Sequence, residues 1–118
     1  MINLNELINT LFEQFSVDGQ VIPVCFMRYK GHGEPYVTYM ELDCDNSMSA
    51  DDDLVGYVAY YDFDIYSKGN YFPIIESVKE LLKNNGFVWQ PSRSSPDMFE
   101  DETGYYHKTL CFAYLKED

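Results

Sequence analysis

The residues with the most obvious chemical potential are five aspartates that lie close together in residues 43–53, DCDNSMSADDD, where no basic residue occurs. Clustered carboxylates suit Ca²⁺, so we compared this stretch with a helix–loop–helix calcium loop that begins at residue 43. The sixth position is then Met48, where glycine is needed, and the twelfth is Leu54, where a bidentate glutamate belongs. The match fails, which leaves a solvated acidic loop or a weak divalent site. The five aspartates are Asp43, Asp45, Asp51, Asp52 and Asp53.

Two histidines and three cysteines are the next candidates for chemistry. The cysteines, at positions 25, 44 and 111, form no close pair, so they do not make a zinc set. No nucleophile elbow, no base spaced against a cysteine and no glycine-rich phosphate cradle occurs. We interpret Cys111 as a small core side chain and His107 as a structural or interface hydrogen-bonding group. The sequence therefore predicts no enzyme, no metal and no cofactor.

Tyrosine is the remaining compositional signal, because eleven tyrosines raise the aromatic content to 17%. A tyrosine ring can pack while its hydroxyl stays hydrogen-bonded, and tyrosine is therefore enriched at protein interfaces. Two interpretations stay open: an interface, or a half-exposed sheet tiled with tyrosines. The tyrosines concerned are Tyr57, Tyr60, Tyr61, Tyr66, Tyr71, Tyr105, Tyr106 and Tyr114.

Length and charge restrict the class of protein. The 118 residues suit one domain, which we take as 1–118. Eight basic against twenty acidic residues give a net charge of −12, which argues against tight binding to nucleic-acid phosphates or to an anionic membrane surface. No apolar run approaches the ~20 residues of a membrane span. Polar residues near the start argue against a signal peptide, so we expect free thiols in a reducing cytoplasm.

The element expected to position these residues is a long central strand over residues 54–70. Successive strand side chains point to opposite faces, so one face is apolar enough for a core and the other mixes carboxylates with aromatic rings. The first set is Val55, Tyr57, Ala59, Tyr61, Phe63 and Ile65. The second set is Gly56, Val58, Tyr60, Asp62, Asp64 and Tyr66.

Two helices and four more strands complete the prediction. Apolar residues at three- and four-residue spacing indicate a helix over residues 3–15 and a second one that Asn70 caps and Asn85-Gly86 ends. Strands are expected over residues 21–29, 36–43, 87–90 and 105–116, the first two as a hairpin, with polar loops over 43–53 and 91–103. The order α-β-β-β-α-β-β predicts an α+β fold: a mainly antiparallel sheet of about five strands with both helices on one face.

Four stretches together resemble the phage tail-completion proteins of long-tailed phages and prophages of Gram-positive hosts, also called tail terminators or head–tail joining proteins. They are YVTYMELD (36–43), SADDDLVGYVAYYDFDIYSKGNY (49–71), LLKNNGFVW (81–89) and EDETGYYHKTLCFAY (100–114), about two thirds of the chain. The family pattern is matched by Ala50-Asp51-Asp52 in the loop, Asp64 to Lys68 at the strand end, Gly86-Phe87 at the helix stop and Tyr106-His107 on the last strand. None of these is a catalytic motif in the family.

The resemblance implies an α+β subunit that assembles into a ring, commonly a hexamer, where the tail tube meets the head. Its implied partners are its own copies, the tail-tube protein and a head-completion or connector protein. Its location is the virion, and the host cytoplasm during assembly. DNA would pass through the ring without being gripped, as the negative charge also suggests. The interaction residues expected are Asp43, Asp45, Asp51, Asp52, Asp53, Tyr60, Asp62, Asp64, Tyr66, Lys68, Tyr106 and His107.

Two other functions remain open from the residues alone. An acidic protein can mimic DNA and inhibit a nucleic-acid-binding protein, which the charge of −12 motivates. Regular carboxylate spacing along one exposed face would support that function, whereas the acids here cluster in two predicted loops. A small hydrolase that uses His107 is the third.

Overall fold

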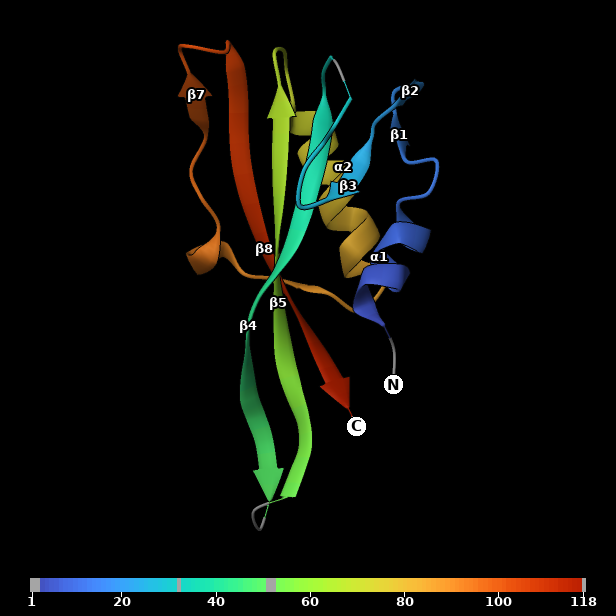
Figure 1. The fold of residues 1–118 in the computed structure, drawn as a ribbon, viewed down its shortest axis with the longest axis vertical. Coiled ribbons are helices and arrows are strands. Elements are labelled where there is room, and N and C mark those ends of the chain that lie inside the picture. The colour runs from blue at the N-terminus through green and yellow to red at the C-terminus, as the bar shows by residue number, and fades with distance from the viewer. Residues whose placement is uncertain (1–2, 32, 51–52, 118) are drawn as a thin grey trace.

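A six-stranded mixed sheet with two helices forms an elongated molecule of 52 × 27 × 24 Å (Figure 1). The computed structural model describes residues 3–31, 33–50 and 53–117. The α+β class is confirmed, but the strand order and the pairing differ in part from the prediction. The sheet order is β3-β4-β5-β8-β6, β7 also pairs with β8, and β1 and β2 form a separate two-stranded sheet.

Both predicted helices are present. Helix α1 (Leu4–Leu11) begins after Asn3, whose side chain accepts a hydrogen bond from the backbone of Glu6, as a capping residue should. Helix α2 (Phe72–Lys83) has Pro73 in its first turn. Its N-cap is Tyr71 and not Asn70 as predicted, although the Asn70 side chain accepts a hydrogen bond from the backbone nitrogen of Phe72. Gly86 ends this segment with a φ of 92°, a left-handed conformation that favours glycine.

The predicted central strand over residues 54–70 is confirmed as far as Ser67, and residues 68–70 lie beyond its end. β5 (Asp53–Ser67) lies between β4 (Tyr36–Ala50) and β8 (Tyr105–Glu117) and is antiparallel to both. Its alternate side chains are buried from Ala59 to Ile65, while Val55 and Tyr57 lie outside the residues whose side chains are described. The alternation in the sequence therefore identified the face that packs under the helices.

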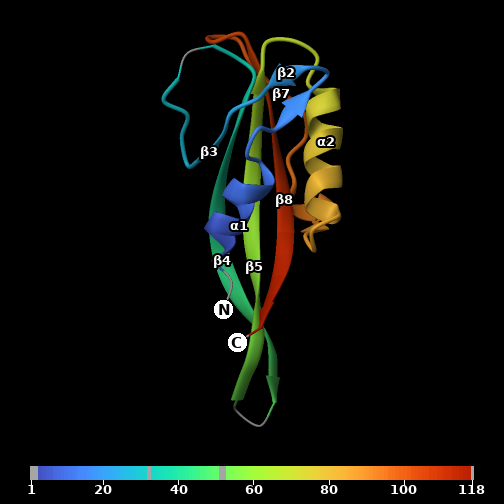
Figure 2. The same cartoon turned by 90° about the vertical axis from the view of Figure 1, so that its right-hand side faces the viewer.

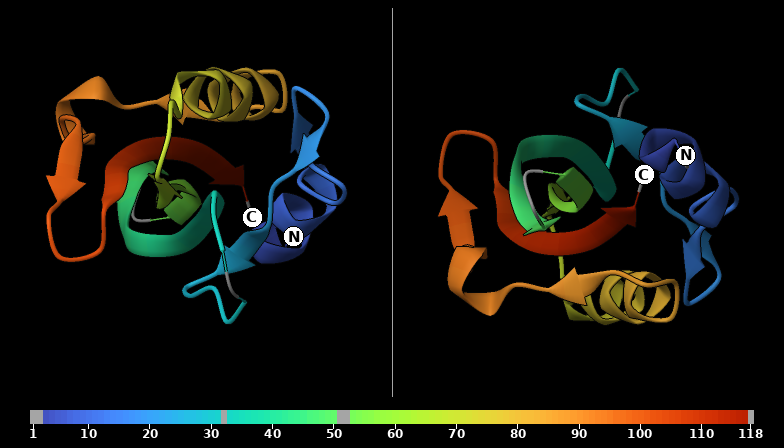
Figure 3. Two further views of the ribbon diagram at one scale, coloured as in Figure 1. Left: turned by 90° about the horizontal axis from the view of Figure 1, so that it is seen from above. Right: turned by 90° about the horizontal axis from the view of Figure 1, so that it is seen from below.

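A single apolar core holds both helices against the same face of this sheet. Burying each large apolar side chain contributes about 1.5–3 kcal/mol relative to exposure, so this cluster is the main source of stability. Figure 3 shows the twisted sheet end-on, with the helices outside it. The core includes Leu4, Ile8, Phe12, Val37, Tyr39, Ala59, Tyr61, Phe63, Ile65, Ile74, Ile75, Val78, Leu82, Phe87, Leu110 and Phe112.

The predicted hairpin of residues 21–29 and 36–43 is wrong. β3 (Val24–Phe26) pairs in parallel with β4, with Val24 opposite Val37. The residues before it form a small hairpin of β1 (Ser16–Val17) and β2 (Gln20–Val21), joined by Asp18-Gly19 with both φ angles positive. An Asp-Gly pair with this geometry is a standard two-residue hairpin turn. The hairpin turn is therefore Asp18-Gly19, which lies earlier in the chain than the predicted hairpin of residues 21–29 and 36–43.

The predicted polar loop at residues 43–53 is also wrong. β4 continues to Ala50 and β5 begins at Asp53, so the two strands form a ribbon that projects beyond the rest of the sheet (Figures 1 and 2). Register shifts interrupt the ribbon at three places. Main-chain hydrogen bonds do not depend on side-chain polarity, so a polar segment can continue a strand pair. Asp51 and Asp52 lie outside the described residues.

The second predicted loop, residues 91–103, holds two elements of its own. After β6 (Val88–Trp89), the chain makes the 3₁₀ turn η1 (Pro91–Arg93) and then β7 (Met98–Glu100). β6 and β7 both run antiparallel to β8. A three-residue strand is too short for its alternation to be recognised, so only its pairing with β8 defines it.

Candidate functional site

The face of the sheet opposite the helices carries five of the twelve predicted interaction residues. We call it the outer face, and strand register arranges nine of its residues in three rows across β4, β5 and β8. One row is aromatic, one contains a bonded carboxylate, and one pairs a carboxylate with a thiol. The rows are Tyr36–Tyr66–His107, Thr38–Asp64–Thr109 and Met40–Asp62–Cys111.

The aromatic row is a continuous stack that extends beyond the three strands. Tyr29, from the segment between β3 and β4, stacks on Tyr36 at a centroid distance of 4.6 Å. Tyr36 stacks on Tyr66 at 4.8 Å, and Tyr66 on His107 at 4.2 Å. Tyr105 meets Tyr36 and Tyr66 edge-on. Burial, helped by nearby Asp64 and Tyr36, raises the pKa of Tyr66 to about 12, so its hydroxyl stays neutral.

The middle row holds a carboxylate that its neighbours fix in place. Asp64 accepts a hydrogen bond from the Thr109 hydroxyl, and the same oxygen lies 3.0 Å from Nε2 of His107. His107 therefore stacks on one residue and bonds another, so its ring is held on two sides. The hydrogen-bonding role expected for His107 is confirmed.

The third row places Asp62 opposite Cys111. Burial and the charge of Asp64 raise the pKa of Asp62, and among the described residues its Oδ1 atom is buried with no hydrogen-bond partner. Burial, with Asp62 adding to it, raises the pKa of the Cys111 thiol to about 11. Cys111 is buried as expected, but it lies on the outer face and outside the helix-covered core. A thiol protonated at neutral pH is a poor nucleophile.

The segment between β6 and β7 covers this third row. Ser94 accepts a hydrogen bond from the backbone nitrogen of Cys111 at 3.0 Å, and Ser95 accepts from that of Thr109 at 2.8 Å. The Arg93 guanidinium lies 4.0 Å from the centroid of the Tyr60 ring. These serines accept hydrogen bonds from the edge of β8 between the part that pairs with β6 and the part that pairs with β7.

The predicted interaction residues separate into three groups. Tyr60, Asp62, Asp64, Tyr66 and His107 come together on the outer face. Lys68 follows β5, with Nζ 5.2 Å from the Tyr105 ring centroid, and Tyr106 points to the other face. Asp43, Asp45 and Asp53 belong to the projecting ribbon, with side chains outside the described part, and Asp51 and Asp52 lie wholly outside it.

The tyrosines lie in two environments, the core and the outer face, and their predicted interface role stays a prediction. Tyr39 and Tyr61 are buried in the core, where their hydroxyls bond the Asn9 and Asn5 side chains of α1. Those on the outer face, such as Tyr66, form the stack instead. The alternation along β5 thus separates core tyrosines from surface tyrosines.

An exposed aromatic patch, which the sequence did not single out, lies where α2 begins. Phe72 packs beside Tyr71, and Tyr106 contacts both Tyr71 and Phe99. A hollow of about 510 Å³ opens there. The Tyr71 hydroxyl donates to Asp97, which Lys108 also contacts. Phe99 lies in the segment 91–103 that was predicted as a loop. It reaches this patch because β7 pairs with β8 and places Phe99 opposite Tyr106.

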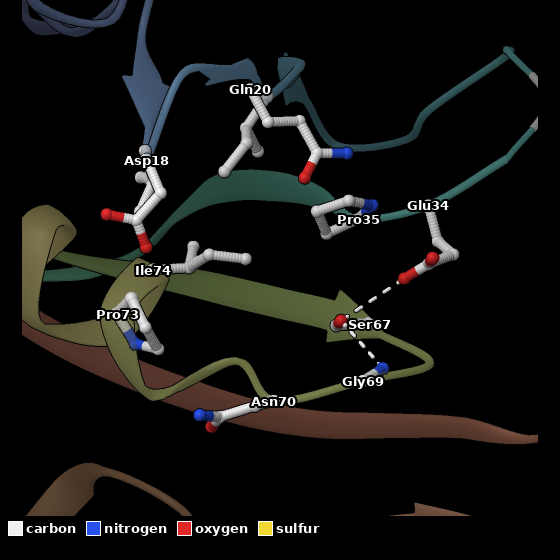
Figure 4. A pocket seen from close by; sticks show the side chains of 11 residues that line it. Asp18, Gln20, Glu34, Pro35, Ser67, Gly69, Asn70, Pro73 and Ile74 are labelled. Carbon is white, nitrogen blue, oxygen red and sulfur yellow. Dashed lines mark hydrogen bonds between the residues drawn. The ribbon is translucent and has the colours of Figure 1, made fainter.

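A smaller cavity of about 230 Å³ lies between the β1–β2 hairpin and the start of α2 (Figure 4). Small-molecule sites usually occupy about 300–1,000 Å³. The Glu34 carboxylate at its rim accepts hydrogen bonds from the Ser67 hydroxyl and the Lys68 backbone nitrogen, at 3.2 and 2.7 Å. This carboxylate therefore ties the start of β4 to the end of β5, which is a structural role.

No described group of three or more His, Cys, Asp or Glu side chains converges as a metal site would require. Among the described helices, none is long and apolar enough to cross a bilayer. A comparison with protein-family models and with curated protein sequences finds no match.

Proposed function

We propose that this chain is a structural phage or prophage protein, a ring-forming tail terminator or head–tail joining subunit. In this role it completes the tail and docks it to the head connector. It would contact its own copies, the tail-tube protein and a head-completion or connector protein. It would bind neither nucleic acid tightly nor a membrane. It would act in the virion, after assembly in the host cytoplasm, without enzymatic activity.

The projecting β4–β5 ribbon is the observation that carries this proposal. Its outer part, residues 45–50 and 53–58, extends past both helices (Figure 2). Only the base of this part pairs with another strand, at Gly56 to Val58 opposite β8. A two-stranded arm has unpaired main-chain groups along its strand edges, which suits contact with another chain. An acidic arm beside passing DNA would also repel the phosphates rather than hold them.

The arrangement of the resembling stretches supports the same function. The stretch that ends in Asp64 to Lys68 and the stretch that contains Tyr106-His107 pair directly, with Tyr66 opposite His107. Residues matched by the family pattern are therefore neighbours on adjacent strands although about forty positions separate them. This proximity is expected if the residues of the family pattern form one surface that is used in assembly.

A shortened ribbon tests the proposal. Asp45 and Val58 are direct cross-strand partners, so an Asn-Gly turn can replace residues 46–57 without changing the register of the rest. We expect the shortened chain to unfold at nearly the same urea concentration as the wild type. It should no longer bind tail-tube protein from the same genome in light-scattering and pull-down experiments.

The control is Glu76→Lys with Glu80→Lys, which changes two exposed residues of α2 and leaves the ribbon intact. It should bind as the wild type does. A wild-type chain that stays monomeric at high concentration, with and without the tail-tube protein, would overturn the proposal.

The DNA-mimic alternative is less well supported. The Asp64 carboxylate contacts the Thr109 hydroxyl and the His107 ring, and Asp62 is partly buried. Neither carboxylate is therefore exposed to solvent in the way that a DNA phosphate is. A pull-down from host lysate that recovers a nucleic-acid-binding protein, and leaves the tail-tube protein unbound, would favour the mimic.

A further inference from the structure

The sheet has an unpaired edge on each side. β3 ends the strand order at one side, and β7 borders β8 at the other. Among the described residues, no strand pairs with the outer side of either. Figures 1 and 3 show these two strands on opposite sides of the molecule. An unpaired strand edge is a template for another chain unless something covers it.

Both edges carry exposed large apolar side chains. On the β3 side, Phe26 is 47% exposed and Met27 is 59% exposed. On the β7 side, Met98 is 37% exposed and Phe99 is 51% exposed. Methionine and aromatic residues are enriched in the buried centres of protein interfaces. Apolar surface at the two edges therefore offers a hydrophobic component to any strand pairing there.

The two edges have opposite charge. Residues 19–31 contain Arg28 and Lys30, both exposed, and no acidic residue. Residues 97–102 contain four exposed acids and no basic residue, and Lys108 contacts one of the four, Asp97. A basic edge is unusual in a chain of net charge −12. Complementary charge selects the partner surface and sets the register of an interface.

Strand direction and position also suit a pairing of β3 with β7. In the sheet these strands run antiparallel to each other, because β3 is parallel to β4 and each later step across β5, β8 and β7 reverses direction. They also lie at neighbouring positions along the strand direction. Met98 of β7 is in the same cross-strand row as Tyr36, and Val24 of β3 is in the row of the next residue, Val37. Copies related by rotation about an axis along the strands would thus pair β7 with β3 antiparallel, without sliding far along the sheet.

We propose that copies of this chain associate head to tail, with β7 of one subunit against β3 of the next. The choice of a second copy as the occupant rests on the proposed function, whereas the choice of edges rests on the geometry and charge above. Two different surfaces meet at this interface, so repetition closes into a ring where the rotation allows it. The projecting ribbons of all subunits then point the same way.

Charge reversal tests this interface. Arg28→Glu with Lys30→Glu makes the β3 edge acidic, and Glu100→Lys with Asp101→Lys makes the β7 edge basic. Each double variant brings like charges together, so self-association should weaken about tenfold or more. In light scattering, the mass should fall towards the 13.8 kDa of one chain. The quadruple variant restores opposite charges and should assemble again.

Glu76→Lys with Glu80→Lys is the matched control, because both residues are exposed on α2, away from the edges. It should assemble as the wild type does. Circular dichroism checks that every variant is folded. All chains are measured alone and with the tail-tube protein, in whichever condition the wild type assembles.

The outcomes separate the two proposals. Double variants that assemble like the wild type would overturn the edge pairing and leave the proposed function intact. Double variants that keep their mass but lose the tail-tube protein would assign the edges to that partner and also overturn the pairing. A wild type that is monomeric in both conditions would overturn both proposals.

Discussion

His107 and Tyr66 stack across β5 and β8, with ring centroids 4.2 Å apart and an interplanar angle of 14°. The same histidine bonds Asp64, one row further along the sheet. This pair joins the end of the central strand to the start of the last one, and it anchors the aromatic stack of the outer face. The stack is therefore a rigid surface that a partner could bind without ordering it first.

Removing the imidazole should destabilise the fold. We expect His107→Ala to lower the free energy of unfolding by about 1–2 kcal/mol, because it loses the stack and the bond to Asp64. His107→Phe keeps a ring on Tyr66 and should lose about half as much. Urea denaturation measures both. Equal losses in the two variants would mean that the stack contributes nothing.

Cys111 should react slowly with alkylating agents. Its pKa of about 11, against a usual value of 9.0, leaves about a hundredfold less thiolate at neutral pH, and its side chain is buried. Peptide mass spectrometry after brief iodoacetamide treatment should find Cys25, which is partly exposed, modified before Cys111. In urea the two should react alike. Rapid modification of Cys111 in the folded protein would contradict its place under residues 94–95.

Asp62→Asn should stabilise the protein at neutral pH. The raised pKa of Asp62 means that the folded state binds its proton more tightly than the unfolded state, whose pKa is near 3.8. The stability from this group is complete below that value and is lost as pH rises through the folded-state pKa. Asparagine imitates the protonated form and does not titrate. The free energy of unfolding of the variant relative to the wild type should therefore rise between about pH 3 and pH 7 in urea titrations.

Asp97→Asn should show the opposite dependence on pH. The Tyr71 hydroxyl that bonds Asp97 lowers the pKa of this carboxyl, and Lys108 lowers it further. Its contribution to stability is present above the unfolded value of 3.8 and is lost as pH falls. The variant should therefore be less stable than the wild type at about pH 7, and the difference should shrink as pH falls below 3.8. Parallel profiles for both variants would contradict the assignment of either environment.

Glu34→Ala should loosen the junction of β4 and β5. The carboxylate accepts from the Ser67 hydroxyl and the Lys68 backbone nitrogen, and loss of a charged acceptor costs about 1–3 kcal/mol. Glu34→Gln keeps a carbonyl oxygen and should lose less. Chemical denaturation compares them. If alanine and glutamine cost the same, the carboxylate charge and not the hydrogen-bond geometry holds the junction.

Local patterns predicted the elements whose burial is regular. The alternation from Ala59 to Ile65, the apolar stripes of both helices and the capping residue Asn3 each lie within a few consecutive residues, and all are present in the fold. The outer-face assignment of Asp62, Asp64 and Tyr66 followed from the same alternation. Such features depend on side-chain periodicity, which is visible without any partner.

Tertiary structure decided the elements that depend on pairing. The direction of β3, the strand character of residues 43–50 and the existence of β7 rest on main-chain hydrogen bonds to strands distant in sequence, which side-chain type hardly influences. The same holds for the site. Tyrosine, histidine and aspartate could be named from the sequence, but only the register of β5 with β8 places His107 on Tyr66 and beside Asp64. Register is a relation between two segments, and neither segment alone contains it.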